Sequence, residues 1–145
     1  MEAINISSIP PAPLSINNGK SQLEIAIEET KGLGRKRIAL INPPSFFLTD
    51  DKVFFSLGLL YIAGLTREAG HEVKLIDLAG RNNYEEIIGE IASENKFDVY
   101  GITSTSPQFS YATKILKAIK QAHPNSRVVI GGPHATMFTS LRKQR

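Results

Sequence analysis

From Ile38 onward, apolar positions alternate between short continuous runs and segments with helical spacing. The short runs are rich in β-branched side chains, which is typical of strands buried on both faces of a parallel sheet. The segments between them repeat apolar residues at intervals of three and four, which is typical of amphipathic helices. The predicted strands are 38–41, 72–76, 98–103 and 127–130, and the predicted helices are 57–69, 84–91 and 112–122.

Strands separated by helices of this length indicate βαβ units with right-handed crossovers. The simplest arrangement is an α/β fold with a flavodoxin-like (Rossmann-like) doubly wound parallel sheet in the strand order 2-1-3-4. Such a sheet normally has a fifth strand, and we expect that strand to be missing or incomplete here. The sequence thus predicts a flexible N-terminal arm at 1–34 and an α/β domain at 35–145 that is truncated at its C-terminus. Within the arm, the spacing at 21–31 fits a short helix and a strand equally well.

The loops that follow the first, third and fourth strands are neighbours in this order, at the edge where open α/β sheets bind ligands. The fourth strand stops on two glycines, so no side chain blocks a large ligand from the backbone. The loop after the third strand is rich in hydroxyls, which can bind amide or phosphate groups or can cap the next helix. The candidate residues of these three loops are Asn42, Pro43, Pro44, Thr103, Ser104, Thr105, Ser106, Gly131, Gly132, Pro133 and His134.

Asp77 ends the second strand, where an acid can accept a ligand hydroxyl, cap a helix or lie on the surface. His134 can contact a ligand, ligate a metal or bond a neighbouring loop. No second histidine or carboxylate stands at ligand spacing from it, so we predict no protein ligand to a metal. His71 and His123 are expected on the surface at the opposite edge of the sheet.

The connection 45–56 is long and carries Phe46, Phe47, Phe54 and Phe55. A long aromatic loop of this kind can be a lid or a contact for a partner, or it can simply cover the upper core. Both interpretations remain open from the sequence.

Composition narrows the function classes. The 145 residues contain no cysteine, which excludes a disulfide, a thiolate nucleophile and an iron–sulfur cluster bound by this chain. The net charge is +3, and no Lys/Arg stripe with interleaved aromatics indicates nucleic-acid binding. No apolar run reaches the ~20 residues of a membrane span. The N-terminus also lacks the layout of a signal peptide, so we expect a cytoplasmic protein.

Several signatures of catalytic or nucleotide-binding folds are missing. No G-x-G-x-x-G follows the first strand and no G-x-x-x-x-G-K-[ST] occurs, so the dinucleotide and P-loop classes lack their phosphate turns. No Ser/His/Asp group and no carboxylate pair can be placed at the ligand edge. We therefore predict that the chain performs no catalysis by itself, and whether it is part of an enzyme stays open.

Five segments, in order and with consistent spacing from about Ile38 to Thr136, resemble a known domain. They are 40–44 (LINPP), 56–63 (SLGLLYIA), 67–73 (REAGHEV) with Asp77, 98–105 (DVYGITST) and 131–136 (GGPHAT). Together they resemble the N-terminal cobalamin (B12)-binding domain of B12-dependent radical-SAM enzymes.

The resemblance implies a corrinoid over the carboxyl ends of the strands, with its nucleotide tail beside the third and fourth strands. Ser104 and Thr105 would bond the tail, and Gly131 and Gly132 would let it pass close to the backbone. The cobalt-ligating D-x-H-x-x-G motif of related cobalamin domains is absent, as in the radical-SAM branch. Cobalt would therefore be the metal carried, without a histidine beneath it.

The resemblance also implies that S-adenosylmethionine and an iron–sulfur cluster belong to a barrel domain that this chain lacks. The expected function is thus a cobalamin-binding module that carries cofactor for a methyltransferase or oxidoreductase. Its expected partners are a radical-SAM domain, or a second copy joined through the open edge of the fourth strand. The alternatives are a flavodoxin-like protein-interaction domain that has lost its ligand, and a nucleotide-binding enzyme fragment.

Overall fold

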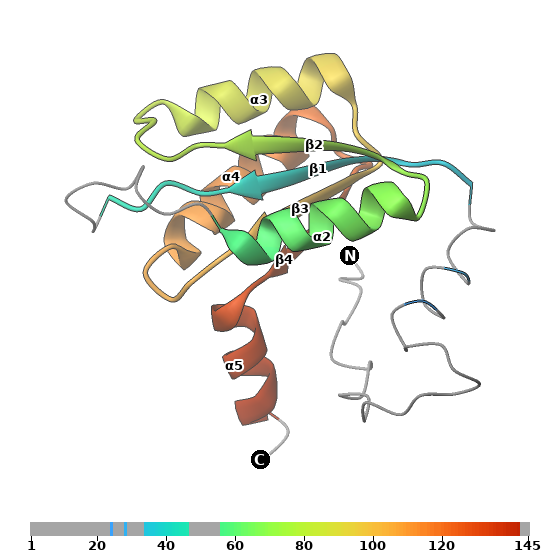
Figure 1. The fold of residues 1–145 in the computed structure, drawn as a ribbon. Coiled ribbons are helices and arrows are strands. Elements are labelled where there is room, and N and C mark those ends of the chain that lie inside the picture. Colours follow the sequence, from blue (N-terminus) through green and yellow to red (C-terminus); the bar gives the residue numbers. More distant parts are fainter. Residues whose placement is uncertain (1–23, 25–27, 29–33, 47–55, 143–145) are drawn as a thin grey trace.

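Four parallel strands form one sheet in the order β2-β1-β3-β4, as Figure 1 shows. The computed structural model describes residues 24, 28, 34–46 and 56–142. The strands are β1 (Arg37–Asn42), β2 (Glu72–Asp77), β3 (Val99–Thr103) and β4 (Arg127–Gly131), and the helices are α2 (Leu57–Glu68), α3 (Tyr84–Asn95), α4 (Phe109–Ala122) and α5 (Pro133–Arg142). The predicted flavodoxin-like α/β fold and its strand order are confirmed.

Two predicted features fall largely outside this part of the chain. Of the predicted arm, the structure describes Glu24, Glu28 and Gly34, and the first two have helical backbone. Of the aromatic loop, it describes Ser45, Phe46 and Ser56; Phe47, Phe54 and Phe55 lie outside the described residues. Among the helices that are described, none combines the length and apolar character needed to cross a membrane.

The main core lies between the sheet and the helices α3 and α4, which pack against each other on one face (Figure 1). Successive strand residues face opposite sides of a sheet, so Tyr100 and Ile102 of β3 point to the same face. Both side chains are buried against this core. From α4, Ala112, Ile115 and Ile119 recur at helical spacing and meet them. Burial of an isoleucine side chain stabilises a fold by about 1.5–3 kcal/mol, and this face holds most of the buried apolar residues of the described chain.

The other face is only partly covered. Helix α2 packs over β2 and β1, where Leu59 and Ala63 meet Leu40. The residues of β3 that point to this side, Val99 and Thr103 among them, are half-buried. Most of the apolar surface of α2 is exposed, through Leu57, Leu60, Tyr61 and Ile62. On this side the described residues thus leave apolar side chains of α2 exposed and residues of β3 only half-buried.

One element was not predicted. The sequence predicts only a turn after β4, whereas the structure shows helix α5 starting at Pro133. Proline suits the first position of a helix because its missing N–H would have no intrahelical partner there. Gly132, with φ of 93°, makes the turn that precedes it. Pro133 and His134 therefore belong to a helix N-terminus rather than to a loop.

Candidate functional site

The carboxyl ends of β1, β3 and β4 lie side by side, so the three predicted loops meet at one edge of the sheet (Figure 1). The pairing is in register, with Ile41 opposite Ile102 and Thr103 opposite Gly131. Strand order alone therefore brings together residues that are far apart in the sequence. The predicted grouping of the three loops at this edge agrees with the structure.

The turn after β4 is pressed against the loop after β3. A Cβ at Gly132 would lie 2.8 Å from both the backbone nitrogen and the backbone oxygen of Ser104. The His134 backbone N–H donates to the same Ser104 oxygen at 3.2 Å. Gly132 is needed here because only a residue without a side chain allows this approach at a positive φ.

The imidazole of His134, at the start of α5, contacts the loop after β3 and the start of α4. Its Nδ1 lies 3.1 Å from Ser106 Oγ, and its ring stacks on Phe109 with centroids 4.2 Å apart. Of the three roles open from the sequence, the structure shows the bond to a neighbouring loop. In the part of the chain that the structure describes, no cluster of three His, Asp or Glu side chains could hold a metal ion.

Two of the predicted hydroxyls are used inside the protein. Ser104 is fully buried and its Oγ donates to the Thr105 carbonyl oxygen at 2.9 Å. Thr105 Oγ1 donates to Gln108 Oε1, also at 2.9 Å. No hydroxyl of the loop caps α4, whose N-cap is Gln108 without a side-chain cap bond. The capping alternative is therefore wrong, and the loop orders itself instead.

Gln108 is the site residue that sequence reasoning missed. It is 7% exposed, and its Nε2 donates to the Pro43 carbonyl oxygen at 3.2 Å and to Ser45 Oγ at 2.6 Å. It thereby ties the loop after β3 to the loop after β1. A single glutamine beside a helix start carries no sequence signal for such a role, because its partners at β1 are 63 and 65 positions away.

The β1 and β2 ends are joined by a side-chain pair. Asn42, which is buried, donates through Nδ2 to Asp77 Oδ1 at 3.0 Å. The same carboxylate oxygen accepts the Ala79 backbone N–H at 3.1 Å. Asp77 is exposed and orients Asn42, and its role toward a ligand stays a prediction.

Phe46 contributes to a cluster of aromatic rings above the main core. Its ring centroid lies 5.4 Å from that of Tyr111 and 6.3 Å from that of Tyr84. Tyr84 itself is buried, and burial, with Glu85 nearby, raises the pKa of its hydroxyl. At Phe46, the aromatic loop thus covers the upper core, as one of its two interpretations predicts.

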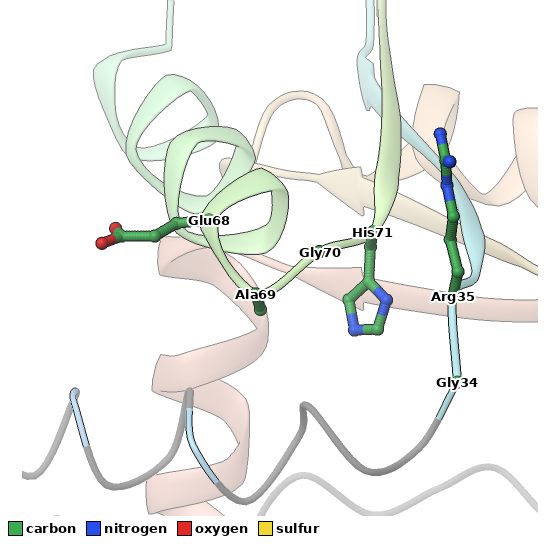
Figure 2. A pocket seen from close by; sticks show the side chains of 6 residues that line it. All are labelled: Gly34, Arg35, Glu68, Ala69, Gly70 and His71. Carbon is green, nitrogen blue, oxygen red and sulfur yellow. The ribbon is translucent and has the colours of Figure 1, made fainter.

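A pocket of about 410 Å³ lies at the opposite, amino-terminal edge of the sheet. Figure 2 shows Arg35, Glu68 and His71 around it, beside the end of α2. His71 Nδ1 accepts the Lys36 backbone N–H at 3.3 Å. None of the predicted site residues lines this pocket, so it is separate from the three-loop edge.

The two histidines at this edge are more buried than predicted. His71 is half-buried rather than on the surface. His123 is half-buried too, because its ring packs against Tyr100 with centroids 6.3 Å apart. Both are structural residues of the edge opposite the loops.

Gly131 is the position where a bulky ligand could reach the backbone. A Cβ built there meets no atom within 4 Å in the part of the chain that the structure describes. Because Val128 and Ile130 pack into the main core, Gly131 faces the other side, next to Thr103. This half of the face has no broad helix cover among the described residues. A bare, reachable backbone beside a hydroxyl fits the tail of a cobalamin.

Comparison with protein families agrees with this geometry. The model of the B12 binding domain matches residues 48–144, which include every described element after β1. The chain belongs to the B12-binding domain family. Cobalamin is accordingly the cofactor of this domain, and the chain is a cobalamin-binding module.

Two curated relatives are similar to parts of the chain. An "Uncharacterized methyltransferase PH0819" of Pyrococcus horikoshii is 36% identical over 85 residues, which cover 59% of this chain and 18% of that protein. The "Cytidylyl-2-hydroxyethylphosphonate methyltransferase" of Streptomyces wedmorensis is 28% identical over an alignment of 123 residues, with 71% of this chain and 23% of that protein covered. The chain therefore spans about a fifth of the length of either relative. No solved structure matches it.

Proposed function

We propose that this B12-binding domain is the cofactor-carrying module of a B12-dependent radical-SAM-type methyltransferase and performs no catalysis by itself. The observation that carries the proposal is the open backbone at Gly131 beside Thr103. The resemblance of five segments to the radical-SAM branch supports the class of parent enzyme. Both relatives are named as methyltransferases, which favours methyl transfer over oxidoreduction.

Cobalamin supplies a cobalt centre that can accept and donate a methyl group. The residues of this chain would bind and orient it rather than react. Thr103 and Gly131 would line the path of the nucleotide tail on the face that α2 leaves open. The remaining proposed site residues frame that path or the carboxyl edge above it, and they are Asn42, Pro43, Pro44, Asp77, Ser104, Thr105, Ser106, Gly132, Pro133 and His134.

The radical-SAM domain would be the partner of the open face. Four large apolar side chains of α2 are exposed among the described residues, and exposed apolar groups that gather on one element can mark a docking surface. The same observation favours the second candidate function, a protein-interaction domain. A homodimer through the free edge of β4 is a further form that the partner could take.

The test is titration of the full chain with hydroxocobalamin, followed by gel filtration and a visible spectrum. Wild-type protein is expected to retain the chromophore. Gly131→Ala should fold normally, because the new methyl group meets no atom of the described residues, yet should bind at least about tenfold more weakly, since it fills the ligand's space. Gly89→Ala, in α3 and also without a neighbour within 4 Å, is the matched control and should bind as the wild type does.

Two results would count against the proposal. A wild-type chain that elutes without chromophore would favour the interaction domain. Retention that is equal in wild type and Gly131→Ala would place cobalamin elsewhere on the chain.

A further inference from the structure

The side-chain amide of Gln108 is buried and has a partner for each of its two ends. Its Oε1 accepts the Thr105 backbone N–H at 3.2 Å and the Thr105 hydroxyl at 2.9 Å. Its Nε2 donates to the Pro43 carbonyl oxygen and to Ser45 Oγ. One planar group thus connects the loop after β1 with the loop after β3, and it does so away from solvent.

This amide is the middle link of a series of side-chain bonds that follows the strand order. Asp77 and Asn42 join the ends of β2 and β1. Gln108 joins the β1 and β3 loops, and the Ser106–His134 pair joins the β3 loop to the start of α5. Beyond the strand ladders, backbone bonds also join Leu78 to Asn42 and His134 to Ser104. Among the described residues no such backbone bond joins the β1 loop to the β3 loop, so the Gln108 amide supplies that link. Gln108 is the buried member of the side-chain series with the most bonds.

We propose that Gln108 is a positioning residue for cobalamin, which sets the spacing of the β1 and β3 loops without touching the cofactor. The inference rests on the proposed function, because it assumes that the ligand lies at this edge. Pro43 and Pro44 are buried and rigid, so their loop can move only as a unit. Loss of the amide would release that unit from Thr105. The free protein would then spend less time in the arrangement that binds cobalamin, and the apparent affinity would fall by that fraction.

The experiment measures the dissociation constant of hydroxocobalamin for variants of the 145-residue chain and divides each value by that of the wild type at the same pH. Gln108→Met has a similar volume and keeps none of the four bonds. It should bind about tenfold more weakly at every pH, as expected when a buried hydrogen-bond partner is removed. Gln121→Met, at an exposed position of the same helix, is the matched control and should leave the ratio at one.

Gln108→Glu separates the donor half of the amide from the acceptor half. The carboxylate can still accept from Thr105 but cannot donate to Pro43 or Ser45, so binding should be weak at pH 8. Burial raises the pKa of a carboxyl group, and once protonated its O–H can donate again. The ratio should therefore return toward one near pH 5. Pro43, Ser45 and Thr105 have no ionisable side chain, and His134 is present in the variant and the wild type alike, so the ratio removes its effect.

The outcomes are distinct. A purely structural amide would lower the unfolding midpoint of Gln108→Met but leave the dissociation constant of the folded protein unchanged, and that result overturns the inference alone. If Gln108→Met does not fold, Gln108→Glu decides, because binding that stays weak at pH 5 also overturns it. A wild-type chain that does not bind hydroxocobalamin overturns the proposed function and this inference with it.

Discussion

Gly132 packs so closely on Ser104 that a single methyl group would not fit between them. The hypothetical Cβ lies 2.8 Å from two backbone atoms of Ser104 and 3.0 Å from Thr103 Oγ1. Neither backbone atom can move without disturbing the β3 loop. The adjacent Gly131 has the opposite surroundings, with no atom of the described residues within 4 Å of its Cβ position. Two neighbouring glycines therefore serve different purposes: Gly132 permits close packing, and Gly131 leaves the backbone open.

Gly132→Ala is expected to destabilise the fold. A left-handed conformation costs alanine about 1–2 kcal/mol. Forcing atoms into a packed site adds about 1–3 kcal/mol. We expect a loss of about 2–5 kcal/mol in the free energy of unfolding, which is a large share of the stability of a small domain. Urea denaturation followed by circular dichroism measures it.

The control for this loss is Gly89→Ala in the middle of α3. Its Cβ meets nothing and its φ is ordinary, so alanine should stabilise the helix by about 0.5–1 kcal/mol. If Gly132→Ala unfolded at the same urea concentration as the wild type, the turn after β4 could not be packed on Ser104 as described.

His134→Phe tests whether the histidine acts through its ring stack or through its nitrogen. Phenylalanine keeps an aromatic ring above Phe109 and removes the bond to Ser106 Oγ. We expect stability to change by about 1 kcal/mol or less, because the bond is exposed. The visible spectrum of bound hydroxocobalamin should be identical in variant and wild type if, as we expect from the missing D-x-H-x-x-G motif, no histidine ligates the cobalt. A wild-type spectrum with a histidine-ligand signature that disappears in the variant would contradict this.

The strand order and the loop edge could be predicted because both follow from local signals. Alternating apolar runs and helical segments define βαβ units, and the parallel order then places the ends of β1, β3 and β4 together. Helix α5 was not predicted because its local signal is ambiguous. Its sequence follows two glycines and begins with a proline, a combination that suits a loop as well as a helix start.

The site details depend on tertiary contacts that no local pattern encodes. The sequence suggests Ser104 and Thr105 as ligand contacts, but their hydroxyls bond within the loop. Whether a hydroxyl faces a ligand or its own chain depends on what packs behind it, here Gln108. The difference between Gly131 and Gly132 likewise appears only when β4 is placed beside β3.

Asp77→Ala should weaken the fold where β1 and β2 end. The carboxylate accepts bonds from the Asn42 side chain and the Ala79 backbone, and Asn42 is buried. A buried donor left without its partner costs about 1–3 kcal/mol, so we expect a loss in that range by urea denaturation. Asp77→Asn keeps an oxygen at the same place and should lose less than half as much. Equal losses in the two variants would indicate that the charge, rather than the accepted bonds, stabilises this corner.

Tyr100→Phe tests a buried hydrogen bond of the main core whose contribution to stability depends on pH. The Tyr100 ring is fully buried, and its hydroxyl oxygen accepts the Phe97 backbone N–H at 3.2 Å. Removal of that acceptor leaves a buried N–H unpaired, so at pH 7 the variant should be less stable by about 1–3 kcal/mol. Tyr61 is 63% exposed as a residue, so Tyr61→Phe should differ little from the wild type in stability at pH 7.

The advantage of the tyrosine should shrink in alkali. Burial raises the pKa of Tyr100 above its ordinary value of 10.0, against the weaker lowering effects of the Phe97 bond and of Arg37. Above pH 10 the hydroxyl ionises in the unfolded chain before it ionises in the fold, so the unfolded state is favoured. The contribution is complete below that pH and is lost as the pH rises through the folded-state pKa, at about 1.4 kcal/mol per pH unit. Urea titrations at pH 7 and pH 11 should therefore show the gap between wild type and Tyr100→Phe closing, and a gap of constant size would mean that the hydroxyl is solvated.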